Sequence, residues 1–178
     1  HRRARVRVGV QTDDGRRNVT DRVLKIDRIY PDDFRLSRWA GFAESHYLDL
    51  EFPESVSKEE GLVLFLYGWV DFEYSSSNFA AYQAGITLQP PVLEAPGEDG
   101  LMHPVLDPMG FPPGMPRMMT VDVSGLRLCE DGRLRIRTNM EIFWDQAFAG
   151  VDEAGKRMRT HVLQPAVAEL RMLGYPRE

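Results

Sequence analysis

Apolar and polar residues alternate with a period of two through most of this sequence, and this alternation constrains the fold more than any other feature. The longest case runs from Arg133 to Trp144. Successive side chains of an extended strand point to opposite faces, so a period of two is typical of a strand with one buried and one solvated face. We predict one long strand here, with these residues on its buried face: Leu134, Ile136, Thr138, Met140, Ile142 and Trp144.

Shorter segments repeat the pattern. The alternation from Tyr47 to Phe52 and from Met119 to Ser124 predicts two further half-buried strands. At the start of the chain, arginines alternate with Val6, Val8 and Val10, which favours a strand with one solvated face over a basic arm for nucleic acid. Strands of this kind are typical of antiparallel sheets.

The segment from Leu62 to Tyr74 differs from the others because its first half is apolar on both faces. This is expected of a central strand that is covered on both sides. After Gly68 one face turns polar, since Asp71 and Glu73 lie on the same face of the strand as Trp69. We therefore expect the strand to leave the core beyond Gly68.

Glycine and proline turns separate these strands. A polar run followed by an apolar run and Gly85 predicts a short helical turn over residues 75–85, and residues 19–26 can form one more turn. Residues 166–173 alternate like a closing strand. We predict an all-β fold: a single domain over residues 1–178, built as one antiparallel β-sandwich of the jelly-roll, galactose-binding-like kind with one short helical turn. The acidic turns are Asp13-Asp14-Gly15, Glu98-Asp99-Gly100 and Glu130-Asp131-Gly132.

Composition excludes several classes of protein. The longest apolar run, Leu62 to Val70, is under half of the roughly 20 residues that span a bilayer, so no membrane span is predicted. The net charge of −5 argues against a nucleic-acid binder. Cys129 is the one cysteine, so the chain has no internal disulfide. The first residue is His1 rather than Met, and we expect the domain to be excised from a longer multidomain protein.

Aromatic residues beside polar ones are the strongest indication of a binding site. Sugar rings stack on aromatic faces while their hydroxyl groups need carboxylates and amides. The alternative is that Trp69 and Trp144 are core residues. The candidate ligand-binding residues are Trp69, Asp71, Glu73, Asn78, Gln83, Trp144, Asp145 and Gln146.

Catalytic and metal sites are less supported. His46, His103 and His161 belong to no catalytic motif, and catalysis by Asp71 with Glu73 is the less favoured interpretation. No cofactor is expected, with Ca²⁺ on the acidic turns as the alternative. A methionine cluster beside His103 either binds Cu(I) or, as we favour, packs under proline-rich loops. Its members are Met102, Met109, Met115, Met118 and Met119.

Several stretches resemble a known family: the C-terminal β-rich module of bacterial multidomain proteins with FG-GAP and ASPIC/UnbV-type segments and tetratricopeptide repeats. They are residues 14–21, 38–46, 64–71, 111–123 and 135–146, of which Thr138-Asn139-Met140-Glu141-Ile142-Phe143-Trp144-Asp145-Gln146 is the most specific. The family tends to have Lys-Thr where this chain has Arg117-Met118. The resemblance implies a secreted or cell-envelope-associated parent protein and no known activity.

Together these features favour a noncatalytic accessory or interaction module that binds a glycan or a protein partner, in contact with other domains of its parent chain. The lack of any catalytic motif makes an enzyme the less favoured class. The alternative function is a metal-binding structural module, with Ca²⁺ ahead of Cu(I).

Overall fold

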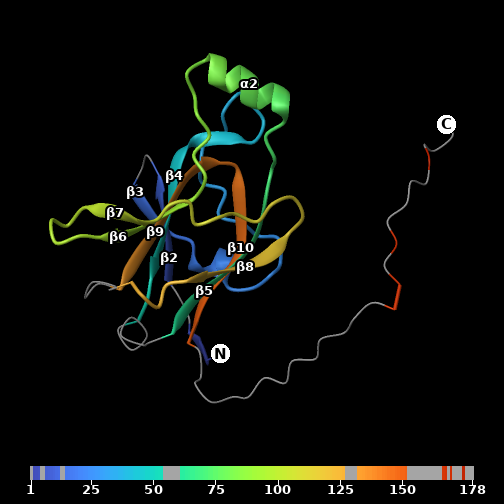
Figure 1. The fold of residues 1–178 in the computed structure, drawn as a ribbon. Helices are drawn as coiled ribbons and strands as arrows, with labels where there is room; N and C mark the ends of the chain where they lie inside the picture. The colour runs from blue at the N-terminus through green and yellow to red at the C-terminus, as the bar shows by residue number, and fades with distance from the viewer. Residues whose placement is uncertain are drawn as a thin grey trace.

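The chain folds as a sandwich of two antiparallel β-sheets, seen edge-on in Figure 1. A computed structural model describes residues 2–4, 7–12, 15–53, 61–126 and 132–151, together with Ala166, Val167, Glu169 and Gly174. The predicted all-β antiparallel sandwich with a short helix is confirmed. The jelly-roll connection pattern stays a prediction.

One sheet has four strands and the other has six. In sheet order, the four-stranded sheet is β1 (Arg2–Ala4), β10 (Ile142–Val151), β5 (Leu62–Val70) and β8 (Arg117–Asp122). The six-stranded sheet is β3 (Gly15–Asn18), β2 (Arg7–Thr12), β4 (Phe42–Glu51), β9 (Arg133–Met140), β6 (Val92–Pro96) and β7 (Met102–Leu106). The described residues also form the 3₁₀ helix η1 (Thr20–Val23), between β3 and β4, and the α-helix α2 (Ser75–Gln83), between β5 and β6.

The hydrophobic core lies between the two sheets. On β5, Leu62, Leu64 and Leu66 are buried, as predicted for a central strand. Leu50 of β4 and Leu134 of β9 lie in the same core from the opposite sheet. The outward residues of β5 are half-buried rather than exposed, and two of them stack on rings of β10: Phe65 on Phe148, and Trp69 on Phe143.

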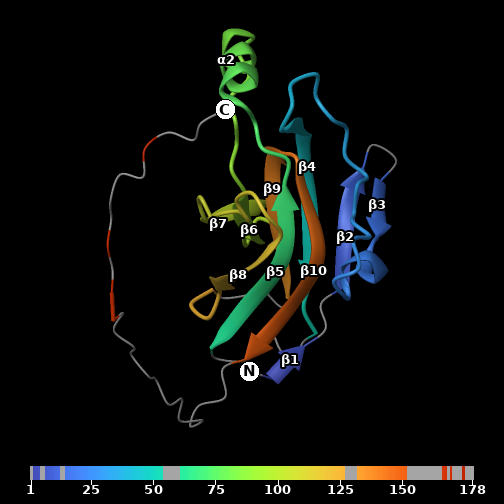
Figure 2. The ribbon, with the colours of Figure 1, turned by 90° about the vertical axis from the view of Figure 1, so that its right-hand side faces the viewer.

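The predicted long strand from Arg133 to Trp144 is wrong in one respect: the structure divides it into two strands in different sheets. β9 ends at Met140 in the six-stranded sheet, and β10 begins at Ile142 in the four-stranded sheet. Only Glu141 separates them, at the corner where the chain crosses from one layer to the other (Figure 2). The alternation continues through the corner because the even-numbered residues of both strands, up to Trp144, face one shared core.

A β-bulge interrupts β10 shortly after the corner. The register with β5 shifts between Trp144 and Gln146, so that Asp145 has no partner on the neighbouring strand. Such a bulge adds one residue to one strand and reverses the parity beyond it. Trp144 and Ala147 are therefore both buried, although they are three positions apart.

The other local predictions agree where the structure describes the chain. β6 and β7 are joined by the predicted turn at residues 98–100, and η1 falls inside the predicted turn at residues 19–26. Asp13, Asp14, Cys129, Glu130 and Asp131 lie outside the described residues, as does most of the predicted closing strand at 166–173. No helix within the described ranges is long and apolar enough to cross a membrane.

Candidate functional site

The most distinctive surface of the molecule is the helix α2, which projects beyond one end of the sandwich (Figure 1). β5 leaves the core at Val70, four residues follow without regular structure, and α2 begins at Ser75. The helix ends at Gln83 with Ala84 as its C-cap, and Gly85 follows with a φ of +78°, a conformation that glycine adopts without strain. The N–H of Ile86 returns to the carbonyl of Ala81 at 2.9 Å and closes the last turn.

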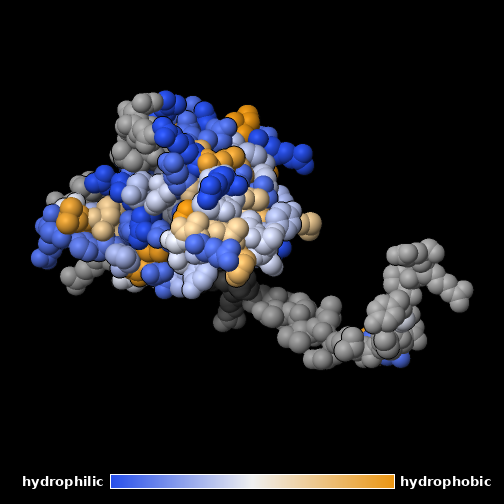
Figure 3. All heavy atoms as spheres, turned by 90° about the horizontal axis from the view of Figure 1, so that it is seen from above, coloured by the Kyte–Doolittle hydropathy of each residue, from blue (hydrophilic) through white to orange (hydrophobic). Residues whose placement is uncertain are grey.

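Large aromatic side chains on α2 point into solvent. Tyr74 is 68% exposed, Phe79 63% and Tyr82 71%, whereas Ala81 is the buried residue of the helix. Tyr74, Asn78 and Tyr82 are four residues apart and share one side of the helix, with Phe79 and Gln83 beside them. We call these five residues the α2 surface. Figure 3 views the molecule from this end.

The α2 surface also lacks charge. From Tyr74 to Leu93 the sequence contains no Asp, Glu, Lys, Arg or His, in a chain with 28% charged residues. Charged side chains keep most solvent-exposed surfaces hydrated, whereas the centres of protein interfaces are depleted of charge and enriched in aromatic residues. Exposed aromatic rings in a segment that carries no charge of its own therefore indicate a binding surface.

Backbone hydrogen bonds fix the base of α2 to the sandwich. The N–H of Asp71 donates to the carbonyl of Glu141 at 3.0 Å, and the N–H of Glu141 donates to the carbonyl of Gly41 at 3.0 Å. Ser77 Oγ lies 2.9 Å from the carbonyl of Tyr74 and 3.2 Å from that of Ala40, so its single hydroxyl proton is shared between the start of α2 and the sandwich. The exit of β5, the corner between β9 and β10, and the start of β4 thus meet at one point beneath the helix.

Glycine is required at position 41 because the backbone at Glu73 passes directly over it. A Cβ on Gly41 would lie 2.4 Å from the backbone nitrogen of Glu73, and the φ of Gly41 is +83°. No side chain fits at such a distance. Gly41 therefore sets how closely the segment leading into α2 approaches β4.

Two acidic side chains are partly enclosed at this base. Burial raises the pKa of Glu141, and the negative charge of Asp71 raises it further. Glu73 has a buried oxygen, Oε2, with no hydrogen-bond partner among the described residues. Asp71 itself is exposed. The base of α2 is therefore acidic, while the helix above it is neutral.

Trp69 lies on the outer face of the four-stranded sheet, at the end of β5. Its ring stacks on Phe143 of β10 with centroids 4.7 Å apart and planes at 19°, and Tyr30 contacts it edge-on at 6.2 Å. The centroid separation equals the spacing of neighbouring strands, so the two rings stand upright side by side and cover one face of each other. This arrangement presents ring edges outward and leaves less aromatic face for a sugar.

Trp144, Asp145 and Gln146 make internal contacts. Trp144 is 4% exposed and belongs to the core, in agreement with the alternative interpretation of this residue. The Asp145 carboxylate accepts the N–H groups of Asp27 and Arg28, and Gln146 Nε2 donates to the carbonyl of Leu24 at 2.9 Å. The two polar side chains thereby attach the segment of residues 24–34 to β10.

The predicted binding residues therefore fall into separate groups. Asn78 and Gln83 belong to the α2 surface, and Asp71 and Glu73 lie at its base. Trp69 is on the sheet face, and the Trp144 to Gln146 triplet is internal. The sequence-based list of binding residues omits Tyr74, Phe79 and Tyr82, although Tyr74 and Tyr82 are among the aromatic residues that lie beside polar ones in the sequence. The charge-free run around them is the signal that identifies them.

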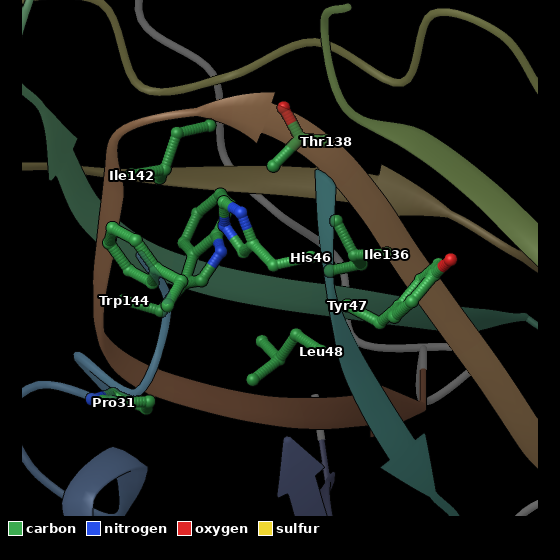
Figure 4. A pocket seen from close by; sticks show the side chains of 9 residues that line it. Pro31, His46, Tyr47, Leu48, Ile136, Thr138, Ile142 and Trp144 are labelled. Atoms are coloured by element: carbon green, nitrogen blue, oxygen red, sulfur yellow. The ribbon is translucent and has the colours of Figure 1, made fainter. Parts of the chain in front are cut away.

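A small pocket opens between the sheets beneath the 24–34 segment (Figure 4). Its volume is about 20 Å³, which is room for about one water molecule. His46 of β4 and Trp144 of β10 point toward one another across it, and apolar side chains such as Ile136 and Ile142 surround them (Figure 4). The pocket is too small for a sugar.

His46 is held in its neutral form in this pocket. Its Nδ1–H donates to the carbonyl of Glu44 at 2.9 Å, and its ring stacks on Phe34 at 4.4 Å. Burial lowers the pKa of His46 from its ordinary value of 6.5, and the hydrogen bond to Glu44 opposes this only in part. The imidazole therefore acts as a neutral packing group at the rim of the core.

The described residues hold no group of three His, Cys, Asp or Glu side chains arranged to bind a metal ion. On the β6–β7 turn, Asp99 Oδ1 is hydrogen-bonded to His103 Nε2 of β7 at 2.9 Å. The methionine cluster is divided between β7, β8 and the chain between them, and Met109 is packed in the core. Calcium binding by the remaining acidic turns stays a prediction, because those turns lie outside the described residues.

Comparison with known proteins identifies no relative. No protein-family model matches the chain, and searches of curated proteins and of solved structures returned no significant match.

Proposed function

We propose that this domain is a noncatalytic interaction module that binds a partner protein through the α2 surface. The observation that carries the proposal is the combination of strong exposure and absence of charge at Tyr74, Phe79 and Tyr82. Solvent-exposed apolar patches of this kind mark interaction sites on soluble proteins. Tyrosine and other large aromatic residues also dominate the binding energy of protein interfaces.

A protein fits this surface better than a glycan does. Small-molecule and sugar sites are concave, whereas α2 projects outward from the sandwich (Figure 1). An amphipathic or aromatic helix instead docks into a groove on another protein. Asn78 and Gln83 then supply uncharged hydrogen-bonding groups at the rim of the contact.

A membrane fits the α2 surface less well than a protein does, for electrostatic reasons. Membrane-binding segments combine aromatic residues with Lys and Arg, which are attracted to anionic lipids. The 74–93 stretch has no basic residue, Asp71 and Glu73 lie at its base, and the chain carries a net charge of −5. The absence of fixed charge on α2 indicates a partner surface that is itself apolar and uncharged.

The rigid attachment of α2 supports the same proposal. The helix is fixed at its base by the bonds of Asp71 and Ser77 and closed at its end by Ile86. A recognition element that is ordered before binding loses less conformational entropy on association. The resemblance to modules of FG-GAP and ASPIC/UnbV-type proteins supports a secreted or envelope-associated parent protein, possessing other domains that are candidate partners.

Site-specific photo-crosslinking tests the proposal. A photoreactive phenylalanine analogue replaces Tyr82 in the native cells, the crosslinked protein is identified, and its purified form is titrated against the domain. We expect Phe79→Ala and Tyr82→Ala each to weaken binding by about 2 kcal/mol, or about thirtyfold in Kd, as is usual for central aromatic residues. Salt should change the affinity little, because no charge lies on the surface.

Leu101→Ala is the matched control, because Leu101 is 64% exposed but lies on the β6–β7 turn. It should leave binding unchanged. The proposal is contradicted if the purified partner binds the Phe79→Ala and Tyr82→Ala variants as well as the parent. It is also contradicted if these variants instead abolish binding to a glycan array or to phosphatidylcholine vesicles.

A further inference from the structure

The 24–34 segment contacts both sheets but buries few side chains of its own. Asp145 of β10 holds its first half, and His46 of β4 stacks on Phe34 near its end. Pro31 is its one buried residue, while three large apolar side chains are exposed: Leu24, Ile26 and Ile29. A segment with few buried apolar contacts opens at a lower free energy than the strands beneath it. The 24–34 segment can therefore open while the sandwich stays folded.

Part of the burial of His46 comes from this segment. Pro31 and Phe34 line the pocket beside His46, and the Phe34 ring lies over the imidazole with centroids 4.4 Å apart and planes at 14°. Trp144 of β10 and Ile136 of β9 line the pocket from the two sheets (Figure 4). If the segment is displaced, the imidazole faces water where Pro31 and Phe34 now lie.

A protonated His46 meets no counter-charge in this pocket. The other residues that line the pocket are uncharged, and Tyr47 is the one titratable group among them. A charged group without a partner is stable only where water can reach it. The carboxylates on the surrounding elements are engaged elsewhere or exposed: Asp32 and Asp33 with Arg22, Asp145 with the N–H groups of Asp27 and Arg28, and Glu44 in solvent. The arginines next to the contact in the sequence add only positive charge: Arg35 and Arg137.

We propose that the 24–34 segment is a strap that protonation of His46 releases as one unit. Release uncovers Phe143 on the outer face of the four-stranded sheet, together with the tryptophan that stacks on it. Tyr30 and Phe34 of the segment each contact the Phe143 ring, with centroids 5.6 Å apart. Because Phe34 also covers His46, the displacement that hydrates the imidazole takes Phe34 off Phe143. One proton is thereby coupled to the exposure of an apolar surface.

The direction of the pH dependence follows from linkage. With the segment closed, burial lowers the pKa of His46 from its ordinary value of 6.5, and hydration restores that value when the segment opens. The open state therefore binds the proton more tightly than the closed state. Opening should become more frequent as pH falls below 6.5 and level off below the lowered pKa. For one proton the opening constant rises by at most about tenfold per pH unit.

Hydrogen exchange of the chain, followed by NMR, tests whether the segment opens separately. The N–H groups of Asp27 and Arg28 are protected by Asp145. The N–H of Val123 donates to the carbonyl of Leu62 at 3.0 Å and reports unfolding of the sandwich. Asp27 and Arg28 should be protected at least about tenfold less than Val123, and low urea concentrations should hardly change their exchange. If Asp27 and Arg28 exchange only through the opening that exposes Val123, the proposal is overturned.

The same exchange measured in two histidine variants tests the trigger. In the parent, the protection of Asp27 and Arg28, corrected for intrinsic rates, should fall about threefold or more between neutral pH and about pH 5. In His46→Phe it should stay nearly constant. His103→Phe is the matched control, because His103 is exposed on β7, and it should behave like the parent. A pH dependence that persists in His46→Phe, or that disappears in His103→Phe, overturns the proposal.

Linkage also acts in reverse, which gives a test without any substitution of His46. Phe34→Ala removes the ring that covers the imidazole, so NMR titration of the His46 ring should give a pKa closer to 6.5 than in the parent. Ile29→Ala, at an exposed residue of the same segment, should leave the pKa of His46 unchanged. If His46→Phe fails to fold, this titration decides alone. The same pKa of His46 in Phe34→Ala and in the parent overturns the proposal.

Discussion

The carboxylate of Asp145 accepts the backbone N–H of Arg28 with both oxygens, at 3.0 and 3.2 Å, across 117 residues of sequence. It also accepts the N–H of Asp27 at 3.2 Å. Asp145 is the extra residue of the β10 bulge, and Arg28 has a φ of 66°, in the left-handed region. One buried side chain therefore holds the 24–34 segment against β10, and the same segment brings Tyr30 onto Trp69 and Phe143.

Asp145→Ala should destabilise the domain by about 2–3 kcal/mol. Asp145 is 3% exposed, and its loss leaves backbone N–H groups of the 24–34 segment without their charged acceptor. Urea unfolding followed by tryptophan fluorescence measures the change. Asp21→Ala, at an exposed residue of η1, should change stability by less than about 0.5 kcal/mol. Equal effects of the two substitutions would contradict the role assigned to Asp145.

Gly41→Ala should be far more destabilising than Gly85→Ala, although both glycines have positive φ. At Gly85 no atom lies within 4 Å of a new Cβ, so the cost is the backbone conformation alone, about 1–2 kcal/mol. At Gly41 the new Cβ would also collide with the Glu73 backbone at 2.4 Å. Thermal unfolding of the two variants compares them directly. Similar midpoints would show that the chain at Glu73 moves aside freely.

The sequence predicts the strands well because alternation is a local property. β5 and its exit from the core follow from the apolar character of both faces up to Gly68. The corner at Glu141 is not predictable in the same way, since Met140 and Ile142 face one core and the alternation passes through the corner unbroken. Which strands pair is decided by contacts over long sequence separations, which a period of two does not specify.

The candidate site is predicted only in part, for a related reason. Asp145 and Gln146 have the residue types of a ligand site, but a bulge directs them to the 24–34 segment. Whether a polar side chain serves a ligand or a distant backbone N–H depends on that long-range packing. Asn78 and Gln83 are predicted from the sequence because they lie beside aromatic residues, while the exposure of Phe79 depends on α2 standing clear of both sheets.

Asp49→Ala should cost about 3–5 kcal/mol of stability. Asp49 is 1% exposed and accepts two hydrogen bonds from Arg135, from Nε at 2.6 Å and from Nη2 at 3.0 Å. Removing it takes the hydrogen-bonded carboxylate from a mostly buried guanidinium and leaves it only the more distant Glu94. Asp32→Ala removes an ion pair with Arg22 in which the Asp32 side chain is 70% exposed, and should cost less than about 1 kcal/mol. Urea unfolding of both variants provides the test.

Glu141→Gln should stabilise the domain at neutral pH. Burial and then Asp71 raise the pKa of Glu141 above its ordinary value of 4.5, so the folded state binds a proton more tightly than the unfolded state. The stability that this group contributes is present below its ordinary pKa and is lost as pH rises through the raised pKa. The variant should therefore have the higher urea midpoint at neutral pH, and the difference should vanish in acid. A difference that is constant with pH would refute this.

His46 should make the domain sensitive to mild acid. Burial lowers its pKa below the ordinary value of 6.5, so the folded state favours the neutral ring. The stability from His46 is fully present above its ordinary pKa and is lost as pH falls through the lowered one, because the unfolded chain is protonated first. His46→Phe keeps an aromatic ring against Phe34 and removes the titration. Relative to this variant, the parent should lose unfolding free energy progressively as pH falls below 6.5, measured by urea unfolding at a series of pH values. Parallel pH profiles for the two proteins would show that the His46 ring is protonated as readily in the folded chain as in the unfolded one.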